Sequence, residues 1–187
     1  MDIQIHLVCL WPPVLSLYLY VLGKYLGFKG YASIRNMSGS IPRNNENSVE
    51  VTCAIIEGNG HVLAAQRGAR MRMPFKWEFP GGKIDPGETA EECIIREIRE
   101  ELGIDIRIKA MLPPSGHSYP DFYIRLHPFI CQITHGAVVL TEHHAVRWTA
   151  HDQLLALDWA EADIAVVKSY IGYLTNFCQG SEKQSKF

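Results

Sequence analysis

The 187-residue sequence lacks a strong excess of either charge: 18 Lys and Arg residues against 20 Asp and Glu residues give a formal net charge of −2. Proteins that bind nucleic acid polymers usually carry a basic excess, so this class of partner is not expected. The five cysteines are scattered, and no Cys-x-x-Cys pair occurs. This absence argues against a disulfide framework and a thiolate zinc site, and it predicts reduced thiols in a cytoplasmic protein.

A basic N-terminal region is also lacking, so a secretory signal peptide is not expected. The first 48 residues nevertheless differ from the rest of the chain. An uncharged run over 7–22, interrupted by Pro12 and Pro13, is followed by a polar linker over 36–48. Two interpretations of this extension stay open. Residues 7–28 approach the length of a membrane anchor, or the natural chain begins at Met37 and the preceding residues are an over-extended start.

Residues 49–180 predict one α/β domain, followed by a frayed tail over 181–187. Period-two and helical patterns predict strands over 49–57, 61–67, 104–112, 122–133 and 145–148, and helices over 90–102 and 162–177. Loops are expected over 68–76, 77–89 and 113–121, and Pro128 indicates an edge strand or a bulge. A mixed sheet between two helices predicts an α/β/α sandwich, with no membrane contact expected for this domain.

The helix predicted over 90–102 carries three acidic residues on one face. Glu97, Glu100 and Glu101 are spaced i, i+3 and i+4, so their carboxylates lie close together and repel one another. A bound cation would relieve this repulsion, and ligation by carboxylate oxygens suits Mg²⁺ or Mn²⁺. The alternative is a solvated acidic face that the interleaved arginines partly neutralise.

The loop before this helix favours the metal interpretation. Gly81 and Gly82 allow the backbone to approach a ligand closely, and Lys83 supplies a positive charge suited to phosphate. A glycine-rich loop, a lysine and a carboxylate cluster together indicate chemistry on a metal-bound polyphosphate.

The segment from 82 to 104 is similar to the Nudix box, G-x5-E-x7-R-E-U-x-E-E-x-G-U, in which U is a bulky aliphatic residue. Every defined position is filled, by Gly82, Glu88, Arg96, Glu97, Ile98, Glu100, Glu101, Gly103 and Ile104. The preceding WEFPGGKIDPGET resembles the MutT branch of the family, which includes 8-oxo-dGTP diphosphatases and CTP pyrophosphohydrolases. The resemblance covers about residues 49–177 and implies the Nudix fold, an α/β/α sandwich with a mixed β-sheet.

The resemblance implies a metal site and a reaction. The implied metal ligands are the Gly81 main-chain carbonyl and the side chains of Glu97, Glu100 and Glu101. A metal-activated water then attacks the β-phosphorus of a nucleoside triphosphate, releasing the monophosphate and pyrophosphate.

Outside the box, Glu142 resembles a MutT-branch glutamate that approaches the metals, as a further ligand or as a group that assists the base. Glu97 is the other candidate base, and the alternative for Glu142 is an exposed loop acid. The resemblance also implies that the geometry of the loop and the helix is held by Gly82, Glu88, Arg96 and Gly103.

The resemblance also implies a nucleotide site. Its expected residues are Arg67, Arg72, Glu78, Phe79, Pro80, Gly81, Gly82, Lys83, His117 and Asp163. Asp163 falls where the branch places an Asn or Asp that reads the base edge, and the alternative is a helix N-cap. An ionised carboxylate accepts from cytosine N4, whereas a protonated carboxyl donates to a purine carbonyl.

Two substrate classes therefore stay open. The first is 8-oxo-dGTP, with sanitation of the nucleotide pool as the task, and the second is CTP or a modified pyrimidine triphosphate. A third alternative is a nucleotide-sensing module without activity, but such modules tend to lose box residues and all of them are present here. A monomer or a homodimer is expected.

Overall fold

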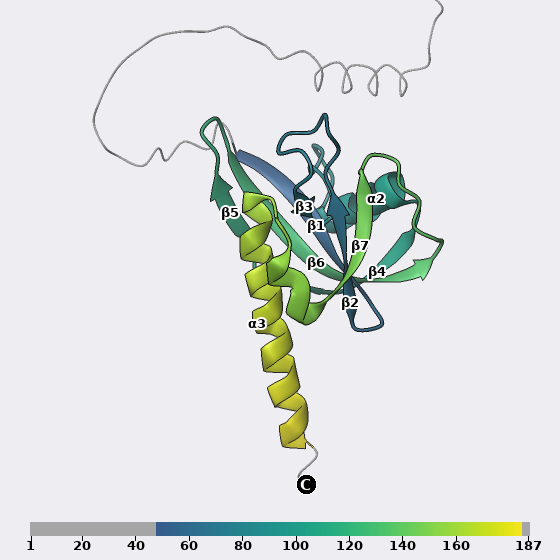
Figure 1. The fold of residues 1–187 in the computed structure, drawn as a ribbon, viewed down its shortest axis with the longest axis vertical. Coiled ribbons are helices and arrows are strands. Elements are labelled where there is room, and N and C mark those ends of the chain that lie inside the picture. The colour runs from purple at the N-terminus through teal and green to yellow at the C-terminus, as the bar shows by residue number, and fades with distance from the viewer. Residues whose placement is uncertain (1–47, 185–187) are drawn as a thin grey trace, which may run out of the picture. The chain divides into compact units, whose positions relative to one another are not determined.

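Figure 1 shows the computed structural model, which describes residues 48–184. The predicted extension, with the alternatives of an anchor over 7–28 and a start at Met37, lies outside the described residues except for its last position. Residues 185–187 of the predicted tail also lie outside them. Among residues 48–184, no helix combines the length and the hydrophobicity that are needed to cross a membrane.

Seven strands form one mixed sheet. They are β1 (Ser48–Gly58), β2 (His61–Gln66), β3 (Trp77–Glu78), β4 (Asp105–Met111), β5 (Ser115–Ser118), β6 (Tyr123–His135) and β7 (Ala145–Ala150). The order is β3-β2-β1-β6-β4, with β5 paired to β6 and β7 paired to β2. Strands β1 and β6 run parallel, whereas the other neighbours run antiparallel. The predicted mixed sheet is confirmed.

Helix α2 (Ala90–Leu102) covers one face of the sheet, and local signals set both of its ends. Thr89 and Glu92 form a capping box at its start, and Gly103 ends it in the left-handed conformation with φ of 66°. Its apolar face packs on a cluster of buried residues that includes Ala54, Ile56, Leu63, Ile94, Ile98 and Leu102.

Helix α3 (Glu161–Gln184) covers the opposite face, after a short 3₁₀ helix over His151–Ala156. Val166, Val167 and Tyr170 are fully buried there against β1 and β2 residues such as Ile55 and Val62. The predicted α/β/α sandwich is therefore confirmed. Helix α3 continues past the predicted end at 177, so residues 181–184 are helical.

Two segments that were predicted as loops contain strands. Residues 115–118 form β5, paired antiparallel to residues 123–126 of β6. Residues 77–78 form β3, paired to residues 65–66 of β2. Both strands are short and lie next to prolines and glycines, so their pairing partners, rather than their own propensity, determine that they are extended.

The edge strand, the first of the two alternatives for Pro128, is wrong, because β6 lies inside the sheet between β1 and β4. The irregularities in the β4–β6 pairing lie between Asp105 and Ile106 and between Ile108 and Ala110. Pro128 is tolerated because it lies where the partner strand changes. Antiparallel pairing to β4 begins at Phe129, and pairing to β5 begins at Leu126. The Pro128 carbonyl accepts a hydrogen bond from the amide of Leu112 at 2.9 Å, and the ring stands where the ladder is interrupted.

Candidate active site

The glycine-rich loop lies directly against β1. The amides of Thr52 and Ala54 donate to the carbonyls of Gly82 and Pro80, both at 2.8 Å. A Cβ on Gly81, where φ is 150°, would lie 2.2 Å from the Thr52 carbonyl oxygen. Only glycine permits this approach of two backbones, which brings the loop within reach of α2.

Acidic side chains from several elements converge beside this loop. Glu101 is buried, and its Oε2 accepts a hydrogen bond from the Gly81 amide at 3.1 Å. Burial raises the pKa of Glu101 well above its usual range, and the charges of Glu97, Glu78 and Glu142 raise it further. Burial also raises the pKa of Glu97, with a further contribution from Glu142. The fold therefore brings Glu142 to the acidic face of α2.

Arg96 joins the loop to the helix. Its Nε and one terminal nitrogen donate to the two carboxylate oxygens of Glu88, at 2.8 and 2.9 Å. These hydrogen bonds lower the pKa of Glu88 to about 2. The other terminal nitrogen lies 2.9 Å from Glu97 and 3.3 Å from Glu100. One guanidinium thus compensates part of the acidic cluster.

The donor chemistry of this cluster fits a hard divalent cation. Within residues 48–184, no group of three or more His, Cys, Asp or Glu side chains is arranged to hold a metal ion as it stands. However, two partly or fully buried carboxyls, Glu97 and Glu101, carry mutual repulsion that Mg²⁺ or Mn²⁺ would relieve. The Glu100 side chain is mostly exposed and forms an ion pair with Arg96, and its charge acts on Glu97. Glu100 could therefore join Glu97 and Glu101 as a ligand.

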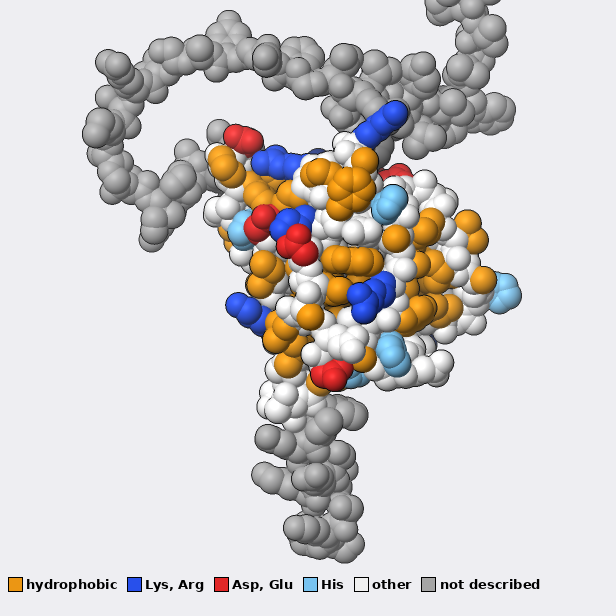
Figure 2. Space-filling view, in the orientation of Figure 1, with side chains coloured by type: hydrophobic (Ala, Val, Ile, Leu, Met, Phe, Trp, Pro, Cys, Tyr) orange, Lys and Arg blue, Asp and Glu red, His pale blue; other side chains and the backbone are white. Residues whose placement is uncertain are grey.

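A cavity of about 180 Å³ adjoins the acidic cluster on the side of the sheet that α3 covers. Around the N-terminal end of α3, Figure 2 shows side chains of both charge signs among apolar ones. The cavity is lined by Val51, Thr52, Cys53, Arg67, Arg72, Met73, Glu78, Phe79, Gly81, Tyr119, Phe122, Ile124, Leu126, Ala160, Ala162 and Asp163.

Six of the ten predicted nucleotide-site residues line this cavity, and four do not. The carbonyls of Pro80 and Gly82 accept hydrogen bonds from amides of β1. Lys83 is exposed on the loop, and His117 packs against the ring of Tyr119, with centroids 4.5 Å apart. The structure therefore places His117 behind an aromatic residue of the cavity wall rather than in the wall itself.

Asp163 is a buried acid whose carboxyl accepts from the main chain. Its side chain accepts a hydrogen bond from the Phe79 amide at 2.9 Å. Burial, and then the charge of Glu78, raise the pKa of Asp163 to about 8. Because α3 begins at Glu161, Asp163 lies inside the first turn, and the alternative of an N-cap is wrong.

Arg67 and Glu78 form a half-buried ion pair in the cavity wall. The Nε of Arg67 also donates to the carbonyl of Arg72 at 2.6 Å. The second oxygen of Glu78 lies 3.0 Å from Nε2 of His143, whose side chain is only 1% exposed. Sequence reasoning did not assign His143, and its position directly after Glu142 was the one available signal.

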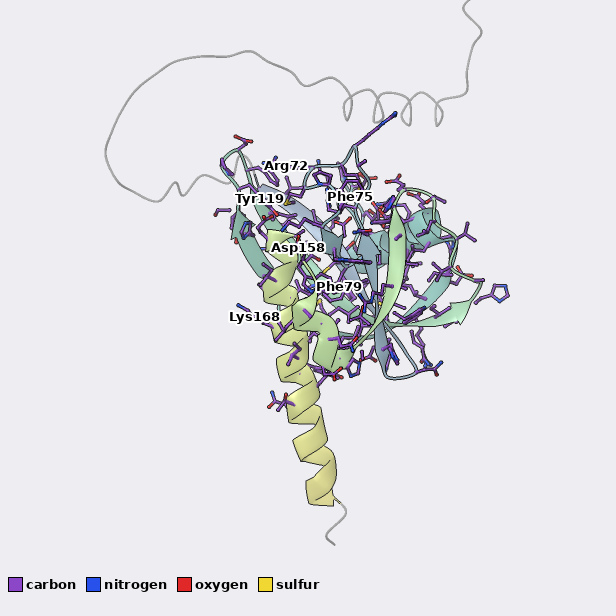
Figure 3. The ribbon with its side chains drawn as sticks, in the orientation of Figure 1. Arg72, Phe75, Phe79, Tyr119, Asp158 and Lys168 are labelled. Atoms are coloured by element: carbon purple, nitrogen blue, oxygen red, sulfur yellow. The ribbon has the colours of Figure 1, made fainter. Side chains whose placement is uncertain are left out.

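Aromatic residues of the β5–β6 hairpin complete the cavity. The guanidinium carbon of Arg72 lies 5.2 Å from the ring centre of Tyr119 and 4.8 Å from that of Phe122, and Figure 3 shows Arg72 beside Tyr119. The two rings stack with centroids 4.9 Å apart. Sequence reasoning assigned neither aromatic residue to the site, because it placed Tyr119 in a loop and Phe122 at the start of a strand. The contact is a cation–π interaction that positions Arg72 at the cavity edge.

Comparison with known proteins agrees with this geometry. The family model described as the NUDIX domain matches residues 46–170. The chain belongs to the Nudix family. A CTP pyrophosphohydrolase of Escherichia coli is 34% identical over 123 residues, which cover 66% of this chain and 91% of that protein. An 8-oxo-dGTP diphosphatase of Proteus vulgaris is 39% identical over 88 residues, 47% of this chain and 77% of that protein.

A solved structure supports the same assignment. The crystal structure of the MutT Nudix hydrolase from Burkholderia pseudomallei matches this Nudix chain with a TM-score of 0.61 at 26% identity. The match covers 66% of this chain and 98% of that chain. This Nudix protein is therefore a hydrolase of MutT type that acts on phosphoric anhydrides.

Alanine substitutions at the two glycines of the Nudix loop are expected to have different effects, one on kcat and the other on stability. A Cβ on Gly82 would lie 2.2 Å from the carboxyl carbon of Glu97, so Gly82→Ala is expected to displace that side chain and lower kcat while the fold persists. Gly81→Ala places a methyl against backbone and is expected to lower the free energy of unfolding by about 2–4 kcal/mol. Urea denaturation and steady-state kinetics on the same samples separate the two effects.

Gly87 offers the matched control. Its φ is 88°, but nothing lies within 4 Å of its Cβ position, so Gly87→Ala should cost only about 1 kcal/mol. If Gly81→Ala destabilised the protein no more than Gly87→Ala, the close approach of the loop to β1 would be contradicted.

Proposed function

We propose that the protein is a Mg²⁺-dependent nucleoside triphosphate pyrophosphohydrolase that acts on oxidised substrates such as 8-oxo-dGTP and sanitises the nucleotide pool. The observation that carries this proposal is the buried carboxyl of Asp163 in a cavity that adjoins the acidic cluster. With a pKa of about 8, this carboxyl is mostly protonated at neutral pH. It therefore offers a donor and an acceptor to a bound base.

The protonated carboxyl of Asp163 places a donor beside an acceptor. On the base edge that carries the modification, this pair matches oxidised guanine better than guanine. 8-Oxoguanine presents the O6 acceptor next to an N7–H donor, whereas guanine presents two acceptors at O6 and N7. A protonated Asp163 pairs with both groups of the first edge. On the second edge one polar group would be left unpaired, and this costs binding energy in a buried site.

The remaining residues supply the chemistry at the phosphates. Glu97, Glu100, Glu101 and Glu142 are the carboxylates that would hold Mg²⁺. The bound ion would neutralise phosphate charge and lower the pKa of the attacking water. Of these carboxylates, Glu97 and Glu142 are the two that could accept the proton of that water. Arg67, which Glu78 holds in the cavity wall, presents its guanidinium to the nucleotide.

A cytosine nucleotide is the second candidate substrate. The Escherichia coli relative is named a CTP pyrophosphohydrolase. Cytosine presents the N4 donor beside the N3 acceptor, and a protonated Asp163 also pairs with this edge. A sensing module without activity is disfavoured because all box residues are present.

A panel of triphosphates tests the proposal on the full chain. Pyrophosphate release is measured with Mg²⁺ from 8-oxo-dGTP, dGTP, CTP, dCTP and 5-methyl-dCTP. We expect kcat/KM for 8-oxo-dGTP to exceed that for dGTP by about 100-fold, and we expect EDTA to abolish release until Mg²⁺ is added back. A preference for the cytosine nucleotides would support the second candidate, and no release from any of the five would reject both.

A further inference from the structure

The loop that carries Glu142 is attached on its first side to the C-terminal end of α2. The Oγ1 of Thr141 lies 2.9 Å from the carbonyl oxygen of Glu100 and 2.8 Å from that of Glu101. The Thr141 amide also donates to the Glu101 carbonyl at 3.3 Å. The last carbonyls of a helix lack partners within the helix, so these contacts satisfy groups that need them. They also tie the loop to the two residues whose side chains belong to the acidic cluster.

On its second side, the same loop is attached to β3. The Nε2 of His143 lies 3.0 Å from Oε1 of Glu78. Because the His143 side chain is almost fully buried, it cannot exchange this partner for solvent. Glu78 is itself held by Arg67 through its other oxygen. The residues on either side of Glu142 therefore have fixed partners on two different elements.

Fold stability alone does not explain a histidine at position 143. The other ring nitrogen, Nδ1, is buried and has no hydrogen-bond partner among residues 48–184. A buried unpaired polar atom is costly and uncommon in native proteins. A buried side chain that carries such a cost points to a role beyond packing.

We propose that Thr141 and His143 are positioning residues, which hold the Glu142 carboxylate toward Glu97 and Glu101 so that it is placed for the reaction before substrate binds. The inference rests on the proposed function and extends it to two residues that do not line the cavity. Residues that orient a metal ligand or a catalytic carboxylate typically change activity by about 10- to 100-fold when they are replaced.

Kinetics on the full chain test the proposal. We expect His143→Ala and Thr141→Val each to lower kcat for the best nucleoside triphosphate by about 10- to 100-fold with KM changed less than about threefold. His143→Gln keeps a donor near the position of Nε2 and is expected to recover most of kcat. Matched controls are His144→Gln and Thr134→Val, which alter an exposed histidine and an exposed threonine hydrogen bond and should change kcat less than about twofold.

Coupling to Glu142 separates positioning from a general structural role. In a Glu142→Gln background, His143→Ala should lower kcat by less than about threefold further, because the group that it positions is already absent. Mn²⁺ affinity is measured by electron paramagnetic resonance without nucleotide. His143→Ala and Glu142→Gln should change this affinity by the same factor. Circular dichroism verifies that each variant is folded.

Three results would overturn the inference. They are a raised KM with kcat retained in His143→Ala, full additivity of the two substitutions, or Mn²⁺ binding that His143→Ala weakens and Glu142→Gln does not. The first would assign His143 to the nucleotide cavity through Glu78. If the wild-type chain hydrolysed no triphosphate, the proposed function would fail, whereas the Mn²⁺ comparison would still test positioning.

Discussion

Glu101→Gln is expected to lower kcat by about 10²- to 10³-fold while the protein becomes more stable without metal. Electrostatic groups aimed at a reacting phosphate typically contribute an effect of this size. Stability should rise because Glu101 is buried beside other acids, which raise its pKa. Its ionised form therefore destabilises the folded state above the usual pKa of a glutamate. Glutamine keeps an acceptor for the Gly81 amide and removes the charge.

Three measurements on this variant check the prediction. Steady-state kinetics give kcat, urea denaturation in EDTA at pH 8 gives the free energy of unfolding, and thermal melting with and without Mn²⁺ reports metal binding. Mn²⁺ should raise the melting temperature of the wild type more than that of Glu101→Gln. Glu91→Gln is the control, because Glu91 is an exposed acid in the first turn of the same helix. Retained activity in Glu101→Gln would remove Glu101 from the metal site.

Asp163→Asn is expected to stabilise the protein at pH 8 by on the order of 2–5 kcal/mol. The pKa of Asp163 is about 8 in the folded protein and about 4 in an unfolded chain. The folded state therefore binds the proton more tightly, and its stability falls as pH rises from about 4 to about 8. Asparagine does not ionise, and its amide oxygen still accepts from the Phe79 amide, so this pH dependence should disappear.

The same variant predicts a change in substrate binding. In the wild type, KM for 8-oxo-dGTP should rise as pH passes 8, because ionised Asp163 loses its donor. In Asp163→Asn the amide remains a donor and the rise should be absent. Asp158→Asn is the control, since the Asp158 side chain is exposed and its carboxylate forms an ion pair with Lys76 at the surface. Parallel pH profiles and an unchanged substrate ranking in Asp163→Asn would exclude Asp163 from base selection.

Features that depend on neighbours in the chain were predictable from the sequence. The bounds of α2 follow from Thr89 at its start and Gly103 at its end, and the structure has the same bounds. The common face of Glu97, Glu100 and Glu101 follows from helical spacing alone. Hydrogen bonds between residues a few positions apart and a fixed number of residues per turn are local properties, so a single sequence contains enough information to predict them.

Features that depend on distant contacts were decided by the tertiary structure. Strand β5 is extended because β6 pairs with it, and Pro128 is tolerated where β4 gives way to β5. The pKa of Asp163 is raised because its carboxyl is buried and because Glu78, far earlier in the chain, lies near it. His143 joined the site because Glu78, 65 residues earlier, lies beside it.

The amino-acid sequence was therefore enough to predict the family, the order of most elements and the acids that could hold a metal. The tertiary structure alone decided which of the predicted nucleotide-site residues line one cavity and which acids are desolvated. The physical reason is that burial and Coulomb interactions depend on distances through space. Those distances arise only when segments far apart in the chain pack together.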